Sequence, residues 1–332
     1  MKRIYKSISK QVYKFNNYEL VPIRSEDRYD IMRWRNEQIY HLRQVKPITK
    51  EDQDSYFDNV IEKLFNQEQP DQILFSFLEN GVCVGYGGLV HINWVDRNAE
   101  VSFVIDTALE INRFIELWVN YLEILKKVSF KDLNLHKIFT YAFDLRPKLF
   151  EALKISSFKE EARLKYHIYF DGDFRDVLIH SFFNPLHNLN IRKAKFSDKN
   201  ILFDWVNEKE VRYNALNSEQ ITVDNHNEWF KSKLKNQLCK IFIFENKDKL
   251  PLGQVRIDCE NGFWVIDYSV DKAYRGLGLG KMMVKRIIEA NKGLKFMAVV
   301  KNCNTSSKII FETLGFHQQD LNSNLVQYIL NS

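Results

Sequence analysis

The feature that most constrains the fold of this chain is that its two halves repeat the same series of short sequence elements. A Trp-x-Asn-Glu element begins at Trp34 and again at Trp205, and an Ile-Thr pair follows each. Three further pairs occur in the same order: CVGYGGL (83–89) with PLGQVRI (251–257), EVSFVID (100–106) with VIDYSVD (265–271), and FEALKISSF (150–158) with FETLGF (311–316). Few residues are identical, but the shared order predicts a tandem duplication and two domains of one fold.

The chain length agrees with two domains, because 332 residues correspond to about two domains of roughly 150 residues each. The boundary is expected within FNPLHNLN (183–190), where Pro185 interrupts regular structure and the segment after it begins like a first strand. We therefore predict domains at 1–186 and 187–332.

Hydrophobic periodicity in the second half predicts an alternation of strands and helices. Helices are expected over 198–212, 223–236, 278–291 and 305–314, and strands over 240–246, 252–258, 263–270, 295–301 and 324–330. This order predicts an α+β (mixed α/β) fold in which a sheet is flanked by helices.

Composition excludes several classes of protein. With 45% hydrophobic and 27% charged residues the chain is a globular protein, and its net charge of +5 suits an anionic small molecule without requiring nucleic acid. The four cysteines (Cys83, Cys239, Cys259 and Cys303) lack metal-ligand spacing, so neither a metal site nor disulfides are expected. No apolar run reaches the roughly 18 residues of a membrane span. We therefore predict a cytoplasmic protein.

The strongest local signal is the segment VDKAYRGLGLGKMMVKRIIE (270–289), in which three glycines alternate between a predicted strand and a predicted helix. Glycines let backbone N–H groups approach an anion closely, and the start of a helix adds a positive dipole. Arg275 and Lys281 flank the loop with positive charge. A pyrophosphate site is therefore predicted, and a glycine turn kept only for tight packing is the alternative. The pattern is neither a Rossmann fingerprint nor a P-loop.

The run Arg275-Gly-Leu-Gly-Leu-Gly280 resembles the Arg/Gln-x-x-Gly-x-Gly/Ala acetyl-CoA signature of the GNAT superfamily of N-acetyltransferases. Downstream, residues 304–316 resemble its second signature, Asn-x-Ala/Ser-Ser-x-x-x-Tyr/Phe-x-x-x-Gly-Phe. The resemblance covers about residues 189–332 and implies a mostly antiparallel central sheet and acetyl-CoA as the donor, without a metal. The cofactor-binding residues that it implies are Tyr268, Val270, Arg275, Gly276, Leu277, Gly278, Leu279, Gly280, Lys281, Asn304, Ser307 and Phe311.

The first half resembles the same superfamily in layout but departs from it at the loop. Residues 110–115, Glu-Ile-Asn-Arg-Phe-Ile, replace the glycines, and Phe143 stands in place of Asn304. Bulky side chains and the charge of Glu110 would exclude a phosphate, so we expect this half not to bind CoA in the usual way. Glu100 nevertheless stands where many members of the superfamily carry the general base.

The resemblance implies direct attack of an amine on the thioester, with the oxyanion meeting a backbone N–H near Ser269 and Val270. Alternation along the strand places Asp267 and Ser269 on one face and Tyr268 on the other. The usual base position is Val265, so Asp267 is predicted as the base and Ser269 as the second catalytic residue; a surface carboxylate is the alternative for Asp267. Since Phe311 replaces the usual acidic Tyr, the proton donor stays open among Tyr268, Tyr274, water and unassisted departure.

Acceptor specificity is expected in 211–230 together with GQVRID (253–258). This half resembles acetyltransferase domains fused to sugar-nucleotide hydrolases of pseudaminic acid-type pathways, which implies a UDP-linked 4-amino-4,6-dideoxy sugar as the acceptor, for surface glycan biosynthesis. The predicted acceptor residues are Asn214, Asn217, His226, Trp229, Arg256 and Asp258. The alternatives are a core position for Trp229, a helix-surface position for His226 and an ion pair on the sheet for Arg256.

Two other functions remain open. The segment LVPIRSEDRYDIMRWRNE (20–37) also resembles the branch of the superfamily that acetylates ribosomal-protein N-termini. A non-catalytic module that binds CoA or a sugar nucleotide would carry the same glycine loop. Turnover with an amine distinguishes an enzyme from such a module.

Overall fold

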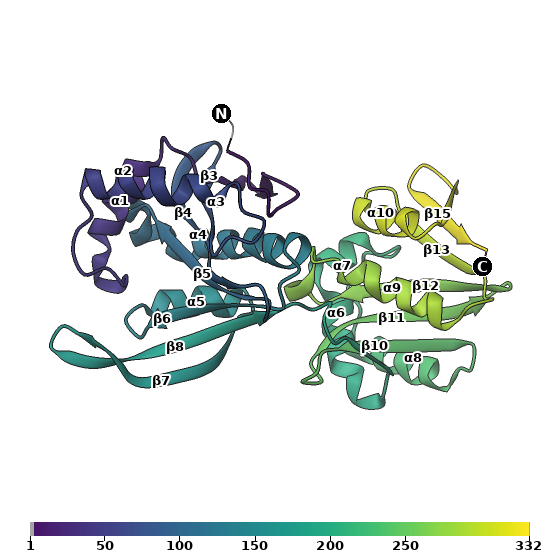
Figure 1. Ribbon diagram of the computed structural model, residues 1–332. Coiled ribbons are helices and arrows are strands. Elements are labelled where there is room, and N and C mark those ends of the chain that lie inside the picture. The colour runs from purple at the N-terminus through teal and green to yellow at the C-terminus, as the bar shows by residue number, and fades with distance from the viewer. Residues whose placement is uncertain (1–2, 332) are drawn as a thin grey trace. The chain divides into compact units, whose positions relative to one another are not determined.

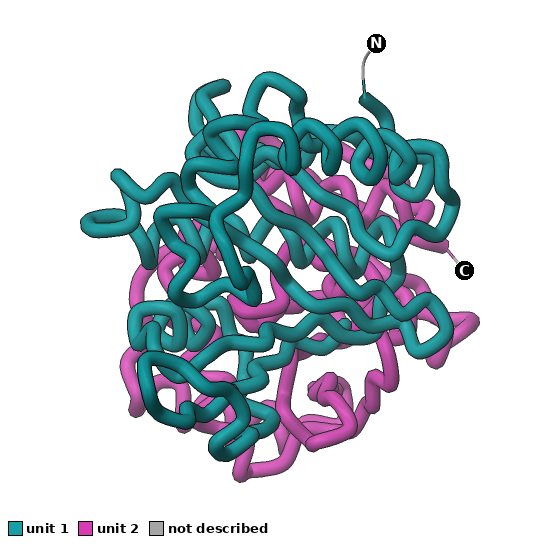
Figure 2. Tube along the Cα trace, turned by 60° about the vertical axis from the view of Figure 1, so that its left-hand side comes forward, with its two compact units in different colours: residues 1–184 teal, residues 185–332 magenta. Residues whose placement is uncertain are grey.

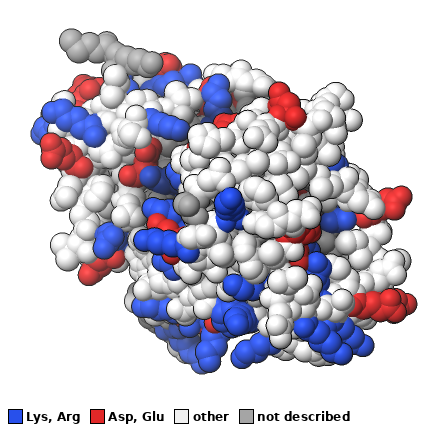
Figure 3. Space-filling view, turned by 90° about the vertical axis from the view of Figure 1, so that its right-hand side faces the viewer, with Lys and Arg blue, Asp and Glu red and all other residues white. Residues whose placement is uncertain are grey.

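The computed structural model describes residues 3–331. The chain divides into two compact units, residues 1–184 and 185–332, shown in teal and magenta in Figure 2. Each unit contains one sheet flanked by helices (Figure 1). Lys and Arg side chains gather in the lower part of the face shown in Figure 3.

The first unit is built on an eight-stranded sheet in the order β1-β2-β3-β4-β5-β6-β8-β7. Its strands are β1 (Tyr13–Phe15), β2 (Tyr18–Pro22), β3 (Ile73–Glu79), β4 (Val82–Asn93), β5 (Asn98–Ile105), β6 (Lys137–Phe143), β7 (Lys159–Phe170) and β8 (Asp173–Phe183). Its helices are α1 (Arg28–Glu37), α2 (Lys50–Tyr56), α3 (Glu62–Leu64), α4 (Thr107–Lys127) and α5 (Pro147–Ile155). The pairing of β5 with β6 is parallel, and the other pairings are antiparallel.

The second unit is built on a seven-stranded sheet in the order β14-β15-β13-β12-β11-β10-β9. Its strands are β9 (Asn190–Lys193), β10 (Cys239–Glu245), β11 (Pro251–Glu260), β12 (Phe263–Val270), β13 (Phe296–Lys301), β14 (His317–Asp320) and β15 (Leu325–Leu330). Its helices are α6 (Lys199–Asn207), α7 (Lys209–Asn214), α8 (Val223–Lys235), α9 (Leu279–Ala290) and α10 (Thr305–Thr313). Here β12 and β13 form the parallel pair. The predicted α+β fold with two mostly antiparallel sheets is confirmed.

In both units the parallel strands pair only at their beginnings. In the second unit the register of β12 and β13 consists of Trp264 with Phe296 and Val265 with Met297. In the first unit β5 and β6 pair from Asn98 with Lys137 to Glu100 with Phe139. Beyond these pairs the strands lose their mutual hydrogen bonds, which leaves backbone groups of each strand free to bind something else. We call each opening the wedge of its unit.

Residue spacing explains most elements of the second unit. Leu279, Met283, Val284 and Ile287 recur on one face of α9 and are at most 1% exposed, so that face packs on the sheet. The helix predicted over 198–212 is instead two helices, because Glu208 adopts an extended conformation (φ −62°, ψ 136°) between α6 and α7. The strand β14 was missed because all its residues are exposed and polar, without the alternation that marks a half-buried strand.

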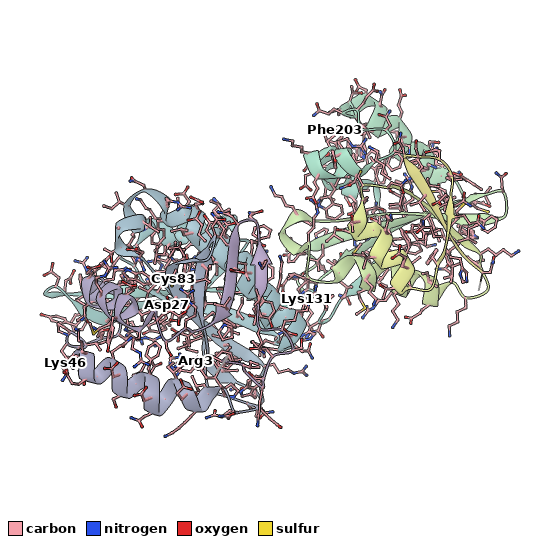
Figure 4. The ribbon with its side chains drawn as sticks, turned by 90° about the horizontal axis from the view of Figure 1, so that it is seen from above. Arg3, Asp27, Lys46, Cys83, Lys131 and Phe203 are labelled. Carbon is pink, nitrogen blue, oxygen red and sulfur yellow. The ribbon has the colours of Figure 1, made fainter. Side chains whose placement is uncertain are left out.

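The first unit holds a buried acidic group beside a thiol, Asp27 and Cys83, which are labelled in Figure 4. Asp27 accepts hydrogen bonds from the Ser76 hydroxyl (2.5 Å) and from Arg24 (2.6 and 2.8 Å). Burial, and then the charge of Asp27, raise the pKa of the Cys83 thiol to about 12, so the thiol stays protonated.

In the described part of the chain no helix is long and apolar enough to cross a membrane.

Candidate functional site

The glycine loop of the second unit presents backbone, not side chains, to solvent. Gly276 (φ 73°) and Gly278 (φ 91°) adopt left-handed conformations, which other residues rarely adopt. Both are exposed, whereas the side chains of Leu277 and Leu279 between them are buried at 2% and 1% exposure and anchor the loop. Gly278 is the N-cap of α9, and no side chain among the described residues caps that helix. Uncapped amides at a helix start form an anion site.

The third glycine serves packing. A Cβ atom on Gly280 would lie 3.1 Å from the Tyr268 ring and 3.3 Å from Ile310, so the absence of a side chain lets α9 lie close to β12 and α10. The alternative of a glycine kept for tight packing therefore describes Gly280. It does not describe Gly278, where a Cβ would meet only Leu186, at 3.8 Å.

Arg275 does not offer a free positive charge, contrary to the sequence prediction. Its guanidinium pairs with Glu208 at 2.5 Å and with Glu210 at 2.8 Å, and its Nε donates to the Val270 carbonyl at 3.0 Å. Arg275 thus ties the end of β12 to the junction of α6 and α7. Lys281 is exposed, so it keeps the charge that the prediction assigned to the loop.

The remaining predicted cofactor residues cluster beside the wedge of the second unit. The Tyr268 hydroxyl lies 2.8 Å from the Ser307 hydroxyl, and burial raises the pKa of Tyr268 to about 12. Asn304 caps α10 by accepting a hydrogen bond from the Ser307 amide, so its side-chain oxygen is already used. Phe311 is 2% exposed and packs against Tyr268, with the ring centroids 6.1 Å apart. Val270 packs against the same core.

The opposite face of β12 carries the predicted base. Ile266 and Tyr268 pack into the core that includes α9, whereas Asp267 is exposed, as the alternation predicts. Its carboxylate accepts a hydrogen bond from the Gln254 amide (3.3 Å) and lies 3.6 Å from an Arg256 nitrogen. Ser269 is paired with Gln254 in the sheet register. A carboxylate, a guanidinium and an amide therefore meet on one polar face of β11 and β12.

Arg256 connects Asp267 to a second group of charges. Its Nε lies 2.8 Å from Asp258, which also accepts a hydrogen bond from Lys233 at 2.7 Å. Burial acts to raise the pKa of Asp258, but the hydrogen bond from Lys233 and neighbouring positive charge outweigh it and the pKa is lowered. The Arg256 guanidinium also lies over the Trp229 ring, 5.2 Å from its centroid. Trp229 is partly buried against the core around Trp205 and Phe230, so Arg256 takes part in both an ion pair on the sheet face and a half-buried cation–π contact.

Three predicted acceptor residues have local structural roles. Asn214 donates to the Glu210 carbonyl in α7 (3.0 Å), and Asn217 accepts from the Glu219 amide (2.8 Å) in the turn that follows. His226 is 2% exposed and packs against Trp229, Phe230 and Phe203, the last labelled in Figure 4. A buried ring cannot contact an acceptor, so the prediction of a binding role for His226 is wrong, and so is the helix-surface alternative.

The segment 211–230, where acceptor specificity is expected, borders a hollow. It is an open surface depression of about 690 Å³ over α6, α7 and the following turn, lined by Asn207, Glu208, Lys209, Glu210, Arg212, Tyr213, Ser218 and Gln220. Lys301 at the end of β13 donates to the Tyr213 carbonyl (2.8 Å) and to Ser218 (2.7 Å), which fixes this turn near the wedge. Lys301 lies more than 80 residues from Tyr213 and Ser218 in the sequence, so the tertiary structure alone brings it to this turn.

His226 gives the first testable prediction, because neither ring nitrogen has a hydrogen-bond partner among the described residues. Burial lowers the pKa of His226. Below about pH 6.5 the unfolded chain therefore binds a proton that the folded chain refuses, and this lowers stability as the pH falls. We expect His226→Leu to raise the free energy of unfolding by about 1 kcal/mol at pH 7 and by more at pH 5.

The measurement is calorimetric unfolding of both proteins from pH 5 to pH 8. His317→Leu removes an exposed histidine of the same unit and should leave the pH dependence unchanged. A stability difference between His226→Leu and the wild type that does not change with pH would contradict the buried neutral state.

The corresponding helix start in the first unit is built differently. α4 follows β5 as α9 follows β12, but its N-cap is Asp106, whose carboxylate accepts a hydrogen bond from the Ala108 amide at 3.0 Å. In the second unit the corresponding Asp271 accepts a hydrogen bond from the Ala273 amide at 2.9 Å in the same way, so the difference is that α4 already includes residues 110–115, which stand in place of the glycine loop. Glu110 of this segment pairs with Arg146 at 2.5 Å. Its carboxylate would repel a phosphate.

Comparison with known proteins identifies the family of both units. A family model described as an acetyltransferase (GNAT) domain matches residues 20–179, and a second model with the same description matches residues 188–317. No curated protein matches the chain.

Solved structures with a similar fold include a spermidine N-acetyltransferase from Vibrio cholerae in complex with CoA and spermine. It has 20% identity and a TM-score of 0.44, and the match covers 50% of this chain and 95% of that one. A domain from Methanocaldococcus jannaschii has 19% identity and a TM-score of 0.40, with 44% and 99% covered. The two family models together match most of the sequence. The chain therefore belongs to the acetyltransferase (GNAT) family, carries two such domains in tandem, and is an N-acetyltransferase that uses acetyl-CoA.

Proposed function

We propose that the unit of residues 185–332 transfers an acetyl group from acetyl-CoA to the amine of a nucleotide-linked amino sugar, of the UDP-4-amino-4,6-dideoxy type, in surface glycan biosynthesis. The observation that carries the choice of acceptor is the face where Arg256 lies over Trp229, 3.6 Å from Asp267. An aromatic ring suits the sugar or base of such an acceptor and a carboxylate suits its amine, while Arg256, which already contacts Asp258 and Asp267, would have to exchange these partners to meet its phosphates.

The donor is proposed to bind at the glycine loop and the wedge of this unit. The exposed amides of residues 276–281 would hold the pyrophosphate of CoA, helped by Lys281. The pantetheine arm would lie along the part of β12 beyond Val265, where the strand no longer pairs with β13. The wedge opens between the two faces of the sheet, so a donor bound there can meet an acceptor on the face that carries Asp267.

In the proposed reaction the amine nitrogen attacks the thioester carbonyl, the C–N bond forms and the C–S bond breaks. Asp267 takes the proton lost by the amine, and a backbone N–H at Ser269 or Val270 stabilises the oxyanion. The Tyr268 hydroxyl is our candidate for the proton given to the departing thiolate. It keeps its proton at neutral pH because burial raises its pKa to about 12, and it lies beside Phe311, which occupies the position of the usual acid.

The first unit is proposed not to bind CoA in the usual way, because residues 110–115, which stand in place of the glycine loop, lie within α4 and include Glu110. Its family membership then reflects fold rather than a second transferase site. The cytoplasm is the proposed location.

The test is a thiol-release assay with acetyl-CoA and a panel of amines. The panel contains UDP-linked 4-amino sugars, a free hexosamine, spermidine and peptides with free N-termini. Turnover with the nucleotide sugars alone supports the proposal. Turnover with peptides would assign the protein to N-terminal acetylation, and turnover with spermidine would assign it to polyamines, the substrate class named for the Vibrio cholerae enzyme. Tight CoA binding without any turnover would indicate a binding module.

A further inference from the structure

One face of β6 in the first unit carries a row of aromatic side chains. Alternate residues of a strand point to the same face, and the alternate residues Phe139, Tyr141 and Phe143 are partly exposed. Phe183 of β8 is paired with Lys137 in the sheet register and therefore belongs to the same face. Its side chain is 43% exposed. We call Phe139, Tyr141, Phe143 and Phe183 the aromatic face.

Helices cover the opposite face of the same strands. Lys126 of α4 lies over the Phe182 ring, 4.7 Å from its centroid, and Phe150 of α5 stacks on His180 with the ring centroids 5.3 Å apart. Phe182 and His180 are buried there. The aromatic face is thus the side of the sheet that stays partly open to solvent.

The fold does not require aromatic residues at this place. In the second unit β13 is the equivalent strand, because it forms the parallel pair of that wedge. Its partly exposed face carries Met297, Val299 and Lys301, none of which is aromatic. Exposed apolar surface that the fold does not need marks a binding site more often than chance. The aromatic face therefore indicates a ligand of the first unit.

The charges beside the rings select a neutral ligand. Lys137 lies 5.5 and 5.7 Å from the centroids of two of these rings, but its ammonium is 2.8 Å from the Glu161 carboxylate. Arg43 lies 4.7 Å from the centroid of the Tyr141 ring and is paired with Glu100. Single-stranded nucleic acids bind to aromatic platforms that also offer free positive charge. Here both cations that lie over the rings are already neutralised.

Polar groups flank the aromatic face on both sides. On the β5 side Glu100 is paired with Phe139 in the register and lies 2.9 Å from Nδ1 of His91. The His91 side chain is 66% exposed, and its Nε2 has no partner among the described residues. On the β7 side Glu161 accepts a hydrogen bond from the Ser181 hydroxyl. Both sides therefore offer donors and acceptors for hydroxyl groups.

A sugar ring matches this combination of groups. A pyranose has apolar C–H faces and hydroxyl edges, and the negative face of an aromatic ring attracts C–H groups. From Phe139 to Phe143 the strand rises about 13 Å, a length that suits several sugar units rather than one. We propose that the first unit binds a neutral oligosaccharide, whose ring faces stack on the aromatic face and whose hydroxyls meet the flanking polar groups.

The experiment is isothermal titration of the full chain with cellotetraose and with tetra-N-acetylchitotetraose. Their equatorial substituents leave both faces of every sugar ring apolar. Phe139→Leu removes one ring but keeps an apolar side chain, Phe139→Tyr keeps the ring, and Tyr141→Leu repeats the test at a second ring. The matched control is Phe174→Leu, because Phe174 is a 56% exposed ring of β8 on the opposite face. Denaturant unfolding checks that each variant is folded.

We expect at least one of the two tetrasaccharides to bind the wild type with a Kd of about 0.1–1 mM. Phe139→Leu and Tyr141→Leu should each weaken binding about tenfold, because each removes one stacked ring. Phe139→Tyr and Phe174→Leu should bind like the wild type. A role of Phe139 in packing alone would change the stability of Phe139→Leu without changing its sugar affinity.

Three results would overturn the inference. The first is that neither tetrasaccharide binds at about 10 mM, well above the expected Kd. The second is equal binding by the wild type, Phe139→Leu and Tyr141→Leu, which would place the sugar elsewhere on the chain. The third is tighter binding of dodecathymidylate than of either sugar, which would make the aromatic face a nucleic-acid platform. None of them depends on which amine the second unit acetylates.

Discussion

Replacing Gly278 with glutamate is expected to reduce acetyl-CoA affinity by at least about 100-fold, or nearly 3 kcal/mol. Gly278 adopts φ 91° at the N-cap of α9, a conformation that costs another residue about 1–2 kcal/mol. A glutamate there also places a carboxylate at the exposed amides that we assign to the pyrophosphate. Like charges repel, so strain and charge act in the same direction. Isothermal titration with acetyl-CoA measures the loss.

The control for this variant is Gly293→Glu. Gly293 has φ 86°, and a Cβ atom there would meet nothing within 4 Å, so the substitution introduces similar strain and the same charge in the same unit. Its acetyl-CoA affinity should equal that of the wild type. If Gly278→Glu also binds normally, the pyrophosphate does not lie at this loop.

Asp267→Asn is expected to lower kcat by about 100-fold or more with the true acceptor, because a positioned general base contributes that much. The amide cannot accept the proton of the amine, yet it keeps the shape of the side chain and can still contact Gln254 and Arg256. Since the Asp267 side chain is 55% exposed, we expect folding to be unaffected. Steady-state rates as a function of pH provide the measurement.

Glu260→Gln supplies the control, because Glu260 is an exposed carboxylate at the end of the neighbouring strand β11. It should leave both kcat and the pH profile unchanged. A loss of less than about threefold for Asp267→Asn would assign the base to another group, since a catalytic base contributes far more.

In each unit a helix follows the strand that borders the wedge, and both units have a wedge. In the second unit α9 begins only after the glycine loop, with Gly278 as its N-cap, whereas in the first unit α4 already includes residues 110–115, which stand in place of that loop. The two units therefore share a topology and differ in the backbone groups that they expose beside the wedge.

Local sequence determined the parts of this protein that depend on neighbours along the chain. The repeated elements predicted two like folds, and the glycine spacing predicted the loop before α9. Alternation along β12 predicted that Asp267 and Tyr268 lie on opposite faces, because successive side chains of a strand point in opposite directions. The cap of α10 is equally local, since Asn304 and the Ser307 amide are three residues apart.

The tertiary structure alone decided which distant groups meet. Arg275 matched the loop signature, but it is neutralised by Glu208 and Glu210, which lie more than 60 residues earlier in the sequence. The spacing of residues in α8 did not decide whether His226 lies on the buried or the exposed face of that helix. Packing against Phe203 of α6 places it on the buried face. Which charged groups pair, and which neighbour covers a given side chain, depends on residues far apart in the sequence, so local spacing alone does not decide it.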